Sequence, residues 1–231
     1  MVRMRKVSLT TGEIYHICNR STEGKHIFES SHDAERFLKT LYDYNTTHEG
    51  LRGARRHPNK SASVKGSPLV EVYATTIMPN HFHILVRQLV DGGITKWMQR
   101  SCNSFSHAYN LVHDRKGTLF MGRFQAVPVL DDHQLFHLLV YIHSNPLDLC
   151  VPHWRSGGVE NWAKAKSFLA NYRWSSLGVY EKGFTADNLF THLVTTDSLH
   201  GFIFDRGGLE NGIRNWSERS LEEIQNLILE D

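Results

Sequence analysis

The chain has 231 residues, of which 40% are hydrophobic and 22% charged, and its net charge is +2 with histidine neutral. This composition is typical of a globular protein and excludes a low-complexity or strongly polyionic chain. No apolar run is long enough to span a bilayer, and the first residues lack the apolar segment of a signal peptide. We therefore expect a cytoplasmic protein that makes no membrane contact.

Two elements are predicted before residue 50. Residues 14–20 are rich in strand-forming side chains, which indicates a first strand. Residues 31–48 begin with serine and acidic side chains, which suit a helix start, and continue with apolar residues at helical spacing. We predict an amphipathic helix there.

The composition changes sharply in residues 51–67. This segment has no acidic residue and five basic ones: Arg52, Arg55, Arg56, Lys60 and Lys65. Such a segment cannot bury a core, so we predict a loop inserted before the second strand. It is either a solvated linker or a grip on the phosphate backbone of a nucleic acid, and both interpretations stay open here.

A hairpin and two further helices follow this loop. The predicted elements are strands at 70–77 and 81–87, a helix at 94–113, a strand at 118–129 and a helix from Asp131 to about Ser144. The first six elements run β-α-β-β-α-β, which is the ferredoxin-like or RRM-like order. We therefore predict an α+β fold with an antiparallel sheet and helices on one face.

The last third of the chain has weaker signals. Residues 148–171 are predicted to be irregular, and residues 189–204 and 221–229 to be helical. We divide the chain into a main domain of residues 1–181 and a small helical C-terminal extension of residues 182–231.

His81 and His83 flank Phe82 at the start of the predicted third strand. Because side chains alternate faces along a strand, both imidazoles lie on one face. Two neighbouring imidazoles can bind a divalent metal, although a strand with two half-exposed histidines and no metal is common.

The predicted helix that ends near Ser144 carries His137, Tyr141 and Asn145 four residues apart, and this spacing places them on one polar face. The amide oxygen of Asn145 can complete a metal site formed by the two histidines. Tyr141 would then stand beside the metal and could attack an electrophile. An ordinary surface tyrosine is the alternative.

Several short segments, in order, resemble one family. His81-Phe82-His83 resembles the histidine-hydrophobe-histidine motif of HUH nucleases. Residues 141–146 resemble the tyrosine segment of single-tyrosine, insertion-sequence type transposases, in particular the REP-associated tyrosine transposases of bacteria. The other matching segments are Tyr15-His16-Ile17, Asn19-Arg20, Met78-Pro79-Asn80-His81, Gly122-Arg123-Phe124 and Tyr172-Arg173-Trp174-Ser175-Ser176. The resemblance spans residues 12 to 180; the loop at 51–67 and the tail from Phe184 have no counterpart in the family pattern.

The resemblance implies a nuclease and strand transferase that cleaves hairpin-bearing single-stranded DNA through a 5′-phosphotyrosine link. It implies Tyr141 as the nucleophile, and Mg²⁺ or Mn²⁺ bound by His81, His83 and Asn145. Candidate DNA-binding residues are Arg20, Arg52, Arg55, Arg56, Lys60, Lys96, Arg100 and Arg123. The protein is expected to be a monomer or a homodimer.

Two other functions are compatible with the same residues. One is a non-catalytic module that binds structured single-stranded nucleic acid, using the sheet and the basic loop. The other is a metal-dependent hydrolase that activates water and needs no covalent step.

Overall fold

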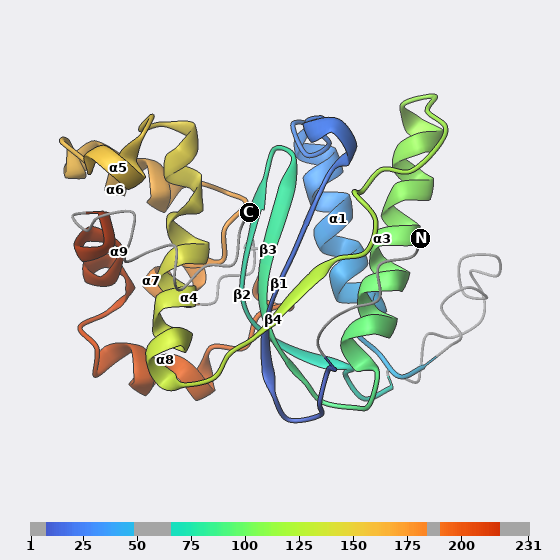
Figure 1. Cartoon of the computed structure of the whole chain (residues 1–231), viewed down its shortest axis with the longest axis horizontal. Coiled ribbons are helices and arrows are strands. Elements are labelled where there is room, and N and C mark those ends of the chain that lie inside the picture. Colours follow the sequence, from blue (N-terminus) through green and yellow to red (C-terminus); the bar gives the residue numbers. More distant parts are fainter. Residues whose placement is uncertain (1–7, 49–65, 184–189, 218–231) are drawn as a thin grey trace.

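The computed structural model describes residues 8–48, 66–183 and 190–217 (Figure 1). Most of the predicted basic loop, with Arg52, Arg55, Arg56 and Lys60, lies outside these ranges. The predicted helix at 221–229 also lies outside them. None of the helices in the described ranges has both the length and the apolar character needed to cross a bilayer.

The centre of the molecule is a four-stranded antiparallel sheet. Its strands are β1 (Ile14–Arg20), β2 (Val70–Met78), β3 (His81–Gln88) and β4 (Gln125–Pro128). Their order in the sheet is β2-β3-β1-β4, with antiparallel pairing throughout. The predicted α+β class with an antiparallel sheet is confirmed.

The fourth strand is much shorter than the predicted strand at 118–129. Gly117 and Gly122 have positive φ values of 92° and 70°, a backbone conformation that strands do not use. The segment before β4 therefore leaves the sheet and is held by loop hydrogen bonds, such as that from Met121 N to Arg20 O. Pro128, which has no N–H to donate, ends the strand.

Two helices, α1 (Ser31–Tyr44) and α3 (Gly93–Val112), cover one face of the sheet (Figure 1). Trp97 is buried there, and its indole N–H donates to Leu41 O at 2.8 Å. The helix predicted at 31–48 ends at Tyr44. Asn45 stops it, because its amide bonds instead with the backbone of Leu69 and Val70.

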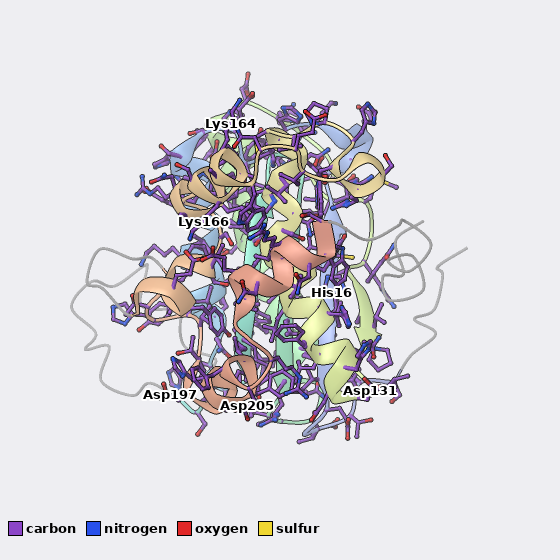
Figure 2. The ribbon with its side chains drawn as sticks, turned by 90° about the vertical axis from the view of Figure 1, so that its left-hand side faces the viewer. His16, Asp131, Lys164, Lys166, Asp197 and Asp205 are labelled. Carbon is purple, nitrogen blue, oxygen red and sulfur yellow. The ribbon has the colours of Figure 1, made fainter. Side chains whose placement is uncertain are left out.

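The opposite face is covered by α4 (Asp132–Ser144), and Figure 2 views the molecule from this side. The helices around α4 are α5 (Trp154–Gly157), α6 (Trp162–Asn171), α7 (Leu177–Lys182), α8 (Asp197–Phe204) and α9 (Leu209–Ser217). The expectation of irregular chain at 148–171 is wrong, because α5 and α6 form there and bury Trp154, Ala165 and Leu169 in the hydrophobic cluster that includes α4.

The tail is helical over a shorter range than the predicted 189–204, because residues 190–196 form turns before α8. These turns pack at the edge of β2, where Val194 pairs with Val72. α9 packs closely on α4, with Gly212 facing Val140 and Phe136. The division at residue 182 stays a prediction.

Candidate functional site

The two histidines of the motif lie on the face of the sheet that α4 covers. In the strand register, His81 is opposite Arg20 and His83 is opposite Cys18. Phe82, between them, points to the other face and packs on Phe37. The two imidazole rings are perpendicular, with centroids 4.9 Å apart. The predicted alternation therefore brings both rings together.

A third histidine, His16 of β1, completes this cluster. Its Nε2 lies 3.0 Å from Nδ1 of His83, and the two rings stack. The sequence argument did not assign His16 to the site. The signal was present, because Tyr15 and Ile17 are core residues, and alternation then sends His16 to the face of the two motif histidines.

All three imidazoles are held in the neutral form. Burial lowers the pKa of His16 to about 4. Burial lowers the pKa of His81 to about 4 as well, with help from the positive charges of Arg20 and Arg155. Burial and the neighbouring histidines place the pKa of His83 well below its ordinary value. Neutral imidazole is the form that binds a metal.

The hydrogen bonds of the rings leave one nitrogen of each motif histidine suited to a metal. Nδ1 of His81 lies 2.7 Å from Oδ1 of Asn80, which can only accept, so Nδ1 is the donor and Nε2 carries the lone pair. When Nδ1 of His83 donates to His16, Nε2 of His83 carries a lone pair in the same way. A hydrogen-bond partner on the other ring nitrogen is what orients metal-binding histidines in proteins.

Few of the described side chains could bind a metal ion at this site. In the ranges that the structure describes, no group of three or more His, Cys, Asp or Glu side chains could hold a metal ion. Two neutral imidazoles fit a divalent ion, and the amide oxygen of Asn145 is a further candidate ligand among the described residues.

Tyr141 points from α4 toward the histidines. Its ring meets those of His83 and His16 edge-on, with centroid distances of 5.3 and 6.0 Å. On its other side lies Trp216 of α9, at 6.3 Å between centroids. The structure thus brings the predicted nucleophile to the predicted metal site from a separate element.

The sequence pattern suggested that the polar face of α4 is exposed to solvent. In the structure this face is buried. His137, Tyr141 and Asn145 are only 8%, 1% and 1% exposed. The expectation assumed that a polar helix face meets water. Instead, this face lies between the sheet and α9, where Trp216 also packs on His137 at 5.1 Å between centroids.

Asn145 begins the short 3-10 helix Asn145–Leu149 that follows α4. Its Nδ2 donates to Tyr141 O at 2.9 Å, and its Oδ1 accepts from Nη2 of Arg155 at 3.2 Å. Arg155 also lies over the Tyr141 ring at 5.5 Å and pairs with Asp148 at 3.1 Å. The sequence argument missed Arg155, because it placed this residue in irregular chain.

The candidate DNA-binding residues separate into two groups. Arg20, Arg123 and His81 line one hollow of about 170 Å³. Lys96 lies near the start of α3, which follows the far end of β3, and Arg100 donates to Thr46 O at 3.1 Å. The structure therefore groups Arg20 and Arg123 with the histidines and leaves Lys96 and Arg100 at the other end of the sheet.

No protein-family model matches the sequence, and no curated protein matches it either. A similar solved structure is that of a REP-associated tyrosine transposase bound to a REP hairpin. It shares 14% sequence identity and a TM-score of 0.50, over 81% of this chain and 90% of that chain. At this identity the likeness shows a common fold.

Proposed function

We propose that this protein is a metal-dependent single-stranded DNA endonuclease and strand transferase that cleaves hairpin-bearing DNA through Tyr141. The observation that carries the proposal is the contact of the Tyr141 ring with His83 and His16, since it joins α4 to the sheet at the motif histidines. The fold likeness to a hairpin-bound tyrosine transposase supports the same conclusion.

In the proposed reaction, the phenolic oxygen of Tyr141 attacks a backbone phosphorus. The bond from phosphorus to the 3′-oxygen breaks, so that one fragment leaves with a 3′-hydroxyl and the other stays joined as a 5′-phosphotyrosine. The phenol gives up its proton as the new bond forms, and the leaving 3′-oxygen takes up a proton. Because the link conserves a phosphoester, religation or transfer needs no external energy source.

His81, His83 and Asn145 would hold a divalent ion, Mg²⁺ or Mn²⁺. Such an ion supplies positive charge next to the phosphate oxygens. Within the described residues, the guanidinium groups of Arg20 and Arg123 form no ion pair, so both are available to bind phosphates on either side of the reacting one. Neutral His16 keeps His83 oriented through the bond between their ring nitrogens.

One observation favours a second function. Tyr141 is 1% exposed, so its hydroxyl cannot reach a phosphate in this arrangement without movement of the elements that cover it. A non-catalytic module that binds structured single-stranded nucleic acid needs no such movement. It predicts DNA binding that depends on salt and is unchanged by chelation of divalent ions.

The test is a covalent-adduct assay with a library of single-stranded hairpins labelled at the 3′ end, with Mg²⁺ or Mn²⁺, analysed on a denaturing gel. We expect an adduct with the wild-type protein and none with Tyr141→Phe. The matched control is Tyr109→Phe on α3, another buried tyrosine, which should retain the adduct.

The alternatives give different results in this assay. An adduct that persists in Tyr141→Phe contradicts the assignment of the nucleophile. Cleavage without any adduct, lost on substitution of His81 but kept in Tyr141→Phe, identifies a hydrolase that activates water. Binding without cleavage, insensitive to chelation, identifies the binding module.

A further inference from the structure

A second pair of histidines lies on α4, apart from the two that flank Phe82. His133 and His137 are four residues apart in the helix, so their side chains stand one above the other on the same face. Their Nε2 atoms are 3.0 Å apart, and their ring centroids are 4.1 Å apart. Neither residue belongs to the proposed metal site at the motif histidines, and neither has a role in the proposed reaction.

The separation of the two nitrogens suits a single metal ion. Ligand nitrogens that are each ~2.0–2.1 Å from one ion lie about 2.9 Å apart at the right angle of square-planar coordination and about 3.3 Å apart at the tetrahedral angle. The observed 3.0 Å falls between these two values. An ion can therefore bind both rings with little movement of either one.

The backbone that carries the pair is fixed from the first turn of α4. Asp131, which marks this end of the helix in Figure 2, caps it by accepting from Gln134 N at 2.7 Å. One turn later His137 is buried, and its ring packs on Trp216 of α9 at 5.1 Å between centroids. His133 is exposed. One ligand is thus anchored, and the other lets an ion reach the pair from solvent.

Without an ion, the contact of the two rings is a hydrogen bond in which one Nε2 donates and the other accepts. An ion needs a lone pair on both Nε2 atoms, so the donated proton moves to Nδ1 of its own ring. The exposed ring of His133 can make this change by exchange with water. Both rings stay neutral, and the carboxylates of Asp131 and Asp132 offset the positive end of the helix.

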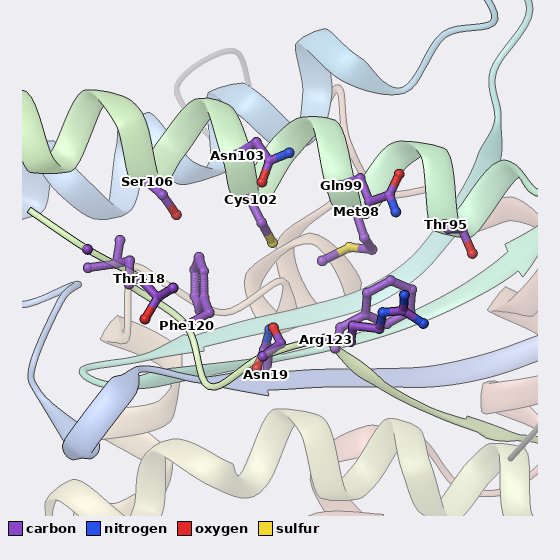
Figure 3. A pocket seen from close by; sticks show the side chains of 14 residues that line it. Asn19, Thr95, Met98, Gln99, Cys102, Asn103, Ser106, Thr118, Phe120 and Arg123 are labelled. Atoms are coloured by element: carbon purple, nitrogen blue, oxygen red, sulfur yellow. The ribbon is translucent and has the colours of Figure 1, made fainter. Parts of the chain in front are cut away.

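The cavity of about 500 Å³ between α3 and the segment 117–124 offers no comparable metal site (Figure 3). The described residues that line it include no imidazole and no carboxylate. Its thiol, Cys102, extends from α3, and burial raises the pKa of this thiol to about 12. Metals bind the thiolate, which this group does not form at neutral pH. The pair on α4 therefore carries the inference.

We propose that His133 and His137 bind one divalent ion of the late first-row transition metals, Cu²⁺, Ni²⁺ or Zn²⁺. Imidazole suits these ions, and the affinity of such a site rises from Mn²⁺ to Cu²⁺. The described part of the chain supplies two ligands, so water or a small anion completes the coordination. This site goes beyond the proposed function and does not depend on it.

The test titrates Cu²⁺ into the full-length protein and counts the bound equivalents by equilibrium dialysis. The starting protein is His81→Ala, because this substitution weakens the motif site and isolates the pair on α4. We expect one tightly bound equivalent, and electron spin echo envelope modulation of the bound Cu²⁺ should show two coordinated imidazoles. Ni²⁺ and Zn²⁺ should compete for this equivalent, whereas Mn²⁺ at the same concentration should not.

The double variant His81→Ala/His133→Ala should bind Cu²⁺ about 100-fold more weakly, because one of two chelating ligands is lost. The matched control is His81→Ala/His107→Ala. His107 is exposed on α3 and has Asn103 and Leu111, not an imidazole, four residues away. This control should keep both the affinity and the two-imidazole signal. Circular dichroism checks that each variant is folded.

Equal Cu²⁺ affinity in the two double variants overturns the inference, and so does a signal from a single imidazole in His81→Ala. Loss of the tightly bound equivalent already in His81→Ala, when the wild-type protein binds one, assigns the ion to the motif histidines and also overturns it. Absence of the Tyr141 adduct contradicts the catalytic proposal and leaves the site on α4 standing.

Discussion

Arg155 donates from Nη2 to Oδ1 of Asn145 at 3.2 Å, so the amide oxygen predicted to bind a metal is already in contact with a cation. The charge of Arg155 also contributes to the lowered pKa values of His81 and His83. An incoming phosphate is a better partner for a guanidinium than an amide is. Transfer of Arg155 to the phosphate would therefore release Asn145 when DNA binds.

From this contact we predict that Arg155→Gln binds Mn²⁺ about tenfold more tightly than the wild-type protein when no DNA is present, a change of ~1.4 kcal/mol. The substitution removes a positive charge and frees the Asn145 oxygen. Free Mn²⁺ is measured by electron paramagnetic resonance. Arg173→Gln, which removes an exposed arginine paired with Glu35, is the control. Equal or weaker Mn²⁺ binding in Arg155→Gln would contradict the idea that Arg155 competes with the metal for the Asn145 oxygen.

Substitutions of the two motif histidines should have the same effect on metal binding but different effects on the free energy of unfolding. Both His81→Ala and His83→Ala should lose Mn²⁺ binding. His83 is fully buried and bonded to His16, so its removal should also lower the free energy of unfolding by about 2–4 kcal/mol. His81 is only partly buried, and its removal should cost less than about 1 kcal/mol. Urea denaturation in the presence of a chelator measures the free energy of unfolding of both variants. Equal losses of stability would contradict the burial argument.

Arg20 and Arg123 should each contribute one phosphate contact. Arg20→Ala and Arg123→Ala should weaken single-stranded DNA binding, and each should reduce the slope of log K against log salt concentration by about 0.7. Anisotropy titrations at several salt concentrations give the slope. Arg100→Ala, whose guanidinium is bonded to Thr46 O away from the histidines, should leave the slope unchanged. An equal change of slope in Arg100→Ala would indicate that the DNA runs along the other end of the sheet.

Gly212→Ala should loosen the contact of α9 with α4. A Cβ at this position would lie 2.7 Å from Cγ2 of Val140 and 3.0 Å from Cζ of Phe136, so one helix must shift. We expect the free energy of unfolding to fall by about 1–3 kcal/mol. Gly201→Ala in α8 is the matched control, because its Cβ would meet no atom within 4 Å, and it should leave the protein as stable or slightly more stable.

The free energy of unfolding should fall at alkaline pH because of Tyr180, a partly buried tyrosine of α7. Burial raises the pKa of Tyr180, whose hydroxyl donates to Tyr73 O at 2.6 Å. The unfolded chain ionises near pH 10 whereas the folded one does not, so this stability is complete below pH 10 and is lost as pH rises further. At pH 11 the loss from Tyr180 is about 1 kcal/mol. Denaturation of Tyr180→Phe at pH 8 and 11 should show a smaller decline in the free energy of unfolding between the two pH values than the wild type shows.

Local patterns were sufficient for the elements that meet the site. The strand beginning at His81 and the helix ending at Ser144 appear within one residue of their predicted bounds, because alternation, the Pro79-Asn80 turn and Asp131 are signals within a few residues. The shortened β4 was not predictable in this way. Its length depends on how Met121 and its neighbours bond to the end of β1, a contact between distant parts of the chain.

The site itself shows the same division. His81, His83 and Tyr141 were predicted because their spacing along one strand and one helix carries the information, whereas His16 of β1 was not assigned to the site. The burial of Tyr141 and the contact of Arg155 with Asn145 depend on α5 and α9, which pack from the C-terminal half. A helix that is polar along one face does not reveal whether water or another helix will cover it.

The strand order β2-β3-β1-β4 has a consequence for how the chain is made. β1, the first of these four strands in chain order, is an interior strand with a partner on each edge in the finished sheet. Its first partner, β3, is synthesised only after α1 and the long basic segment, and β4 follows later still. Until then the nascent chain exposes two unpaired strand edges. The basic segment at 51–67 keeps this early intermediate charged, which opposes pairing between neighbouring nascent chains on a polysome.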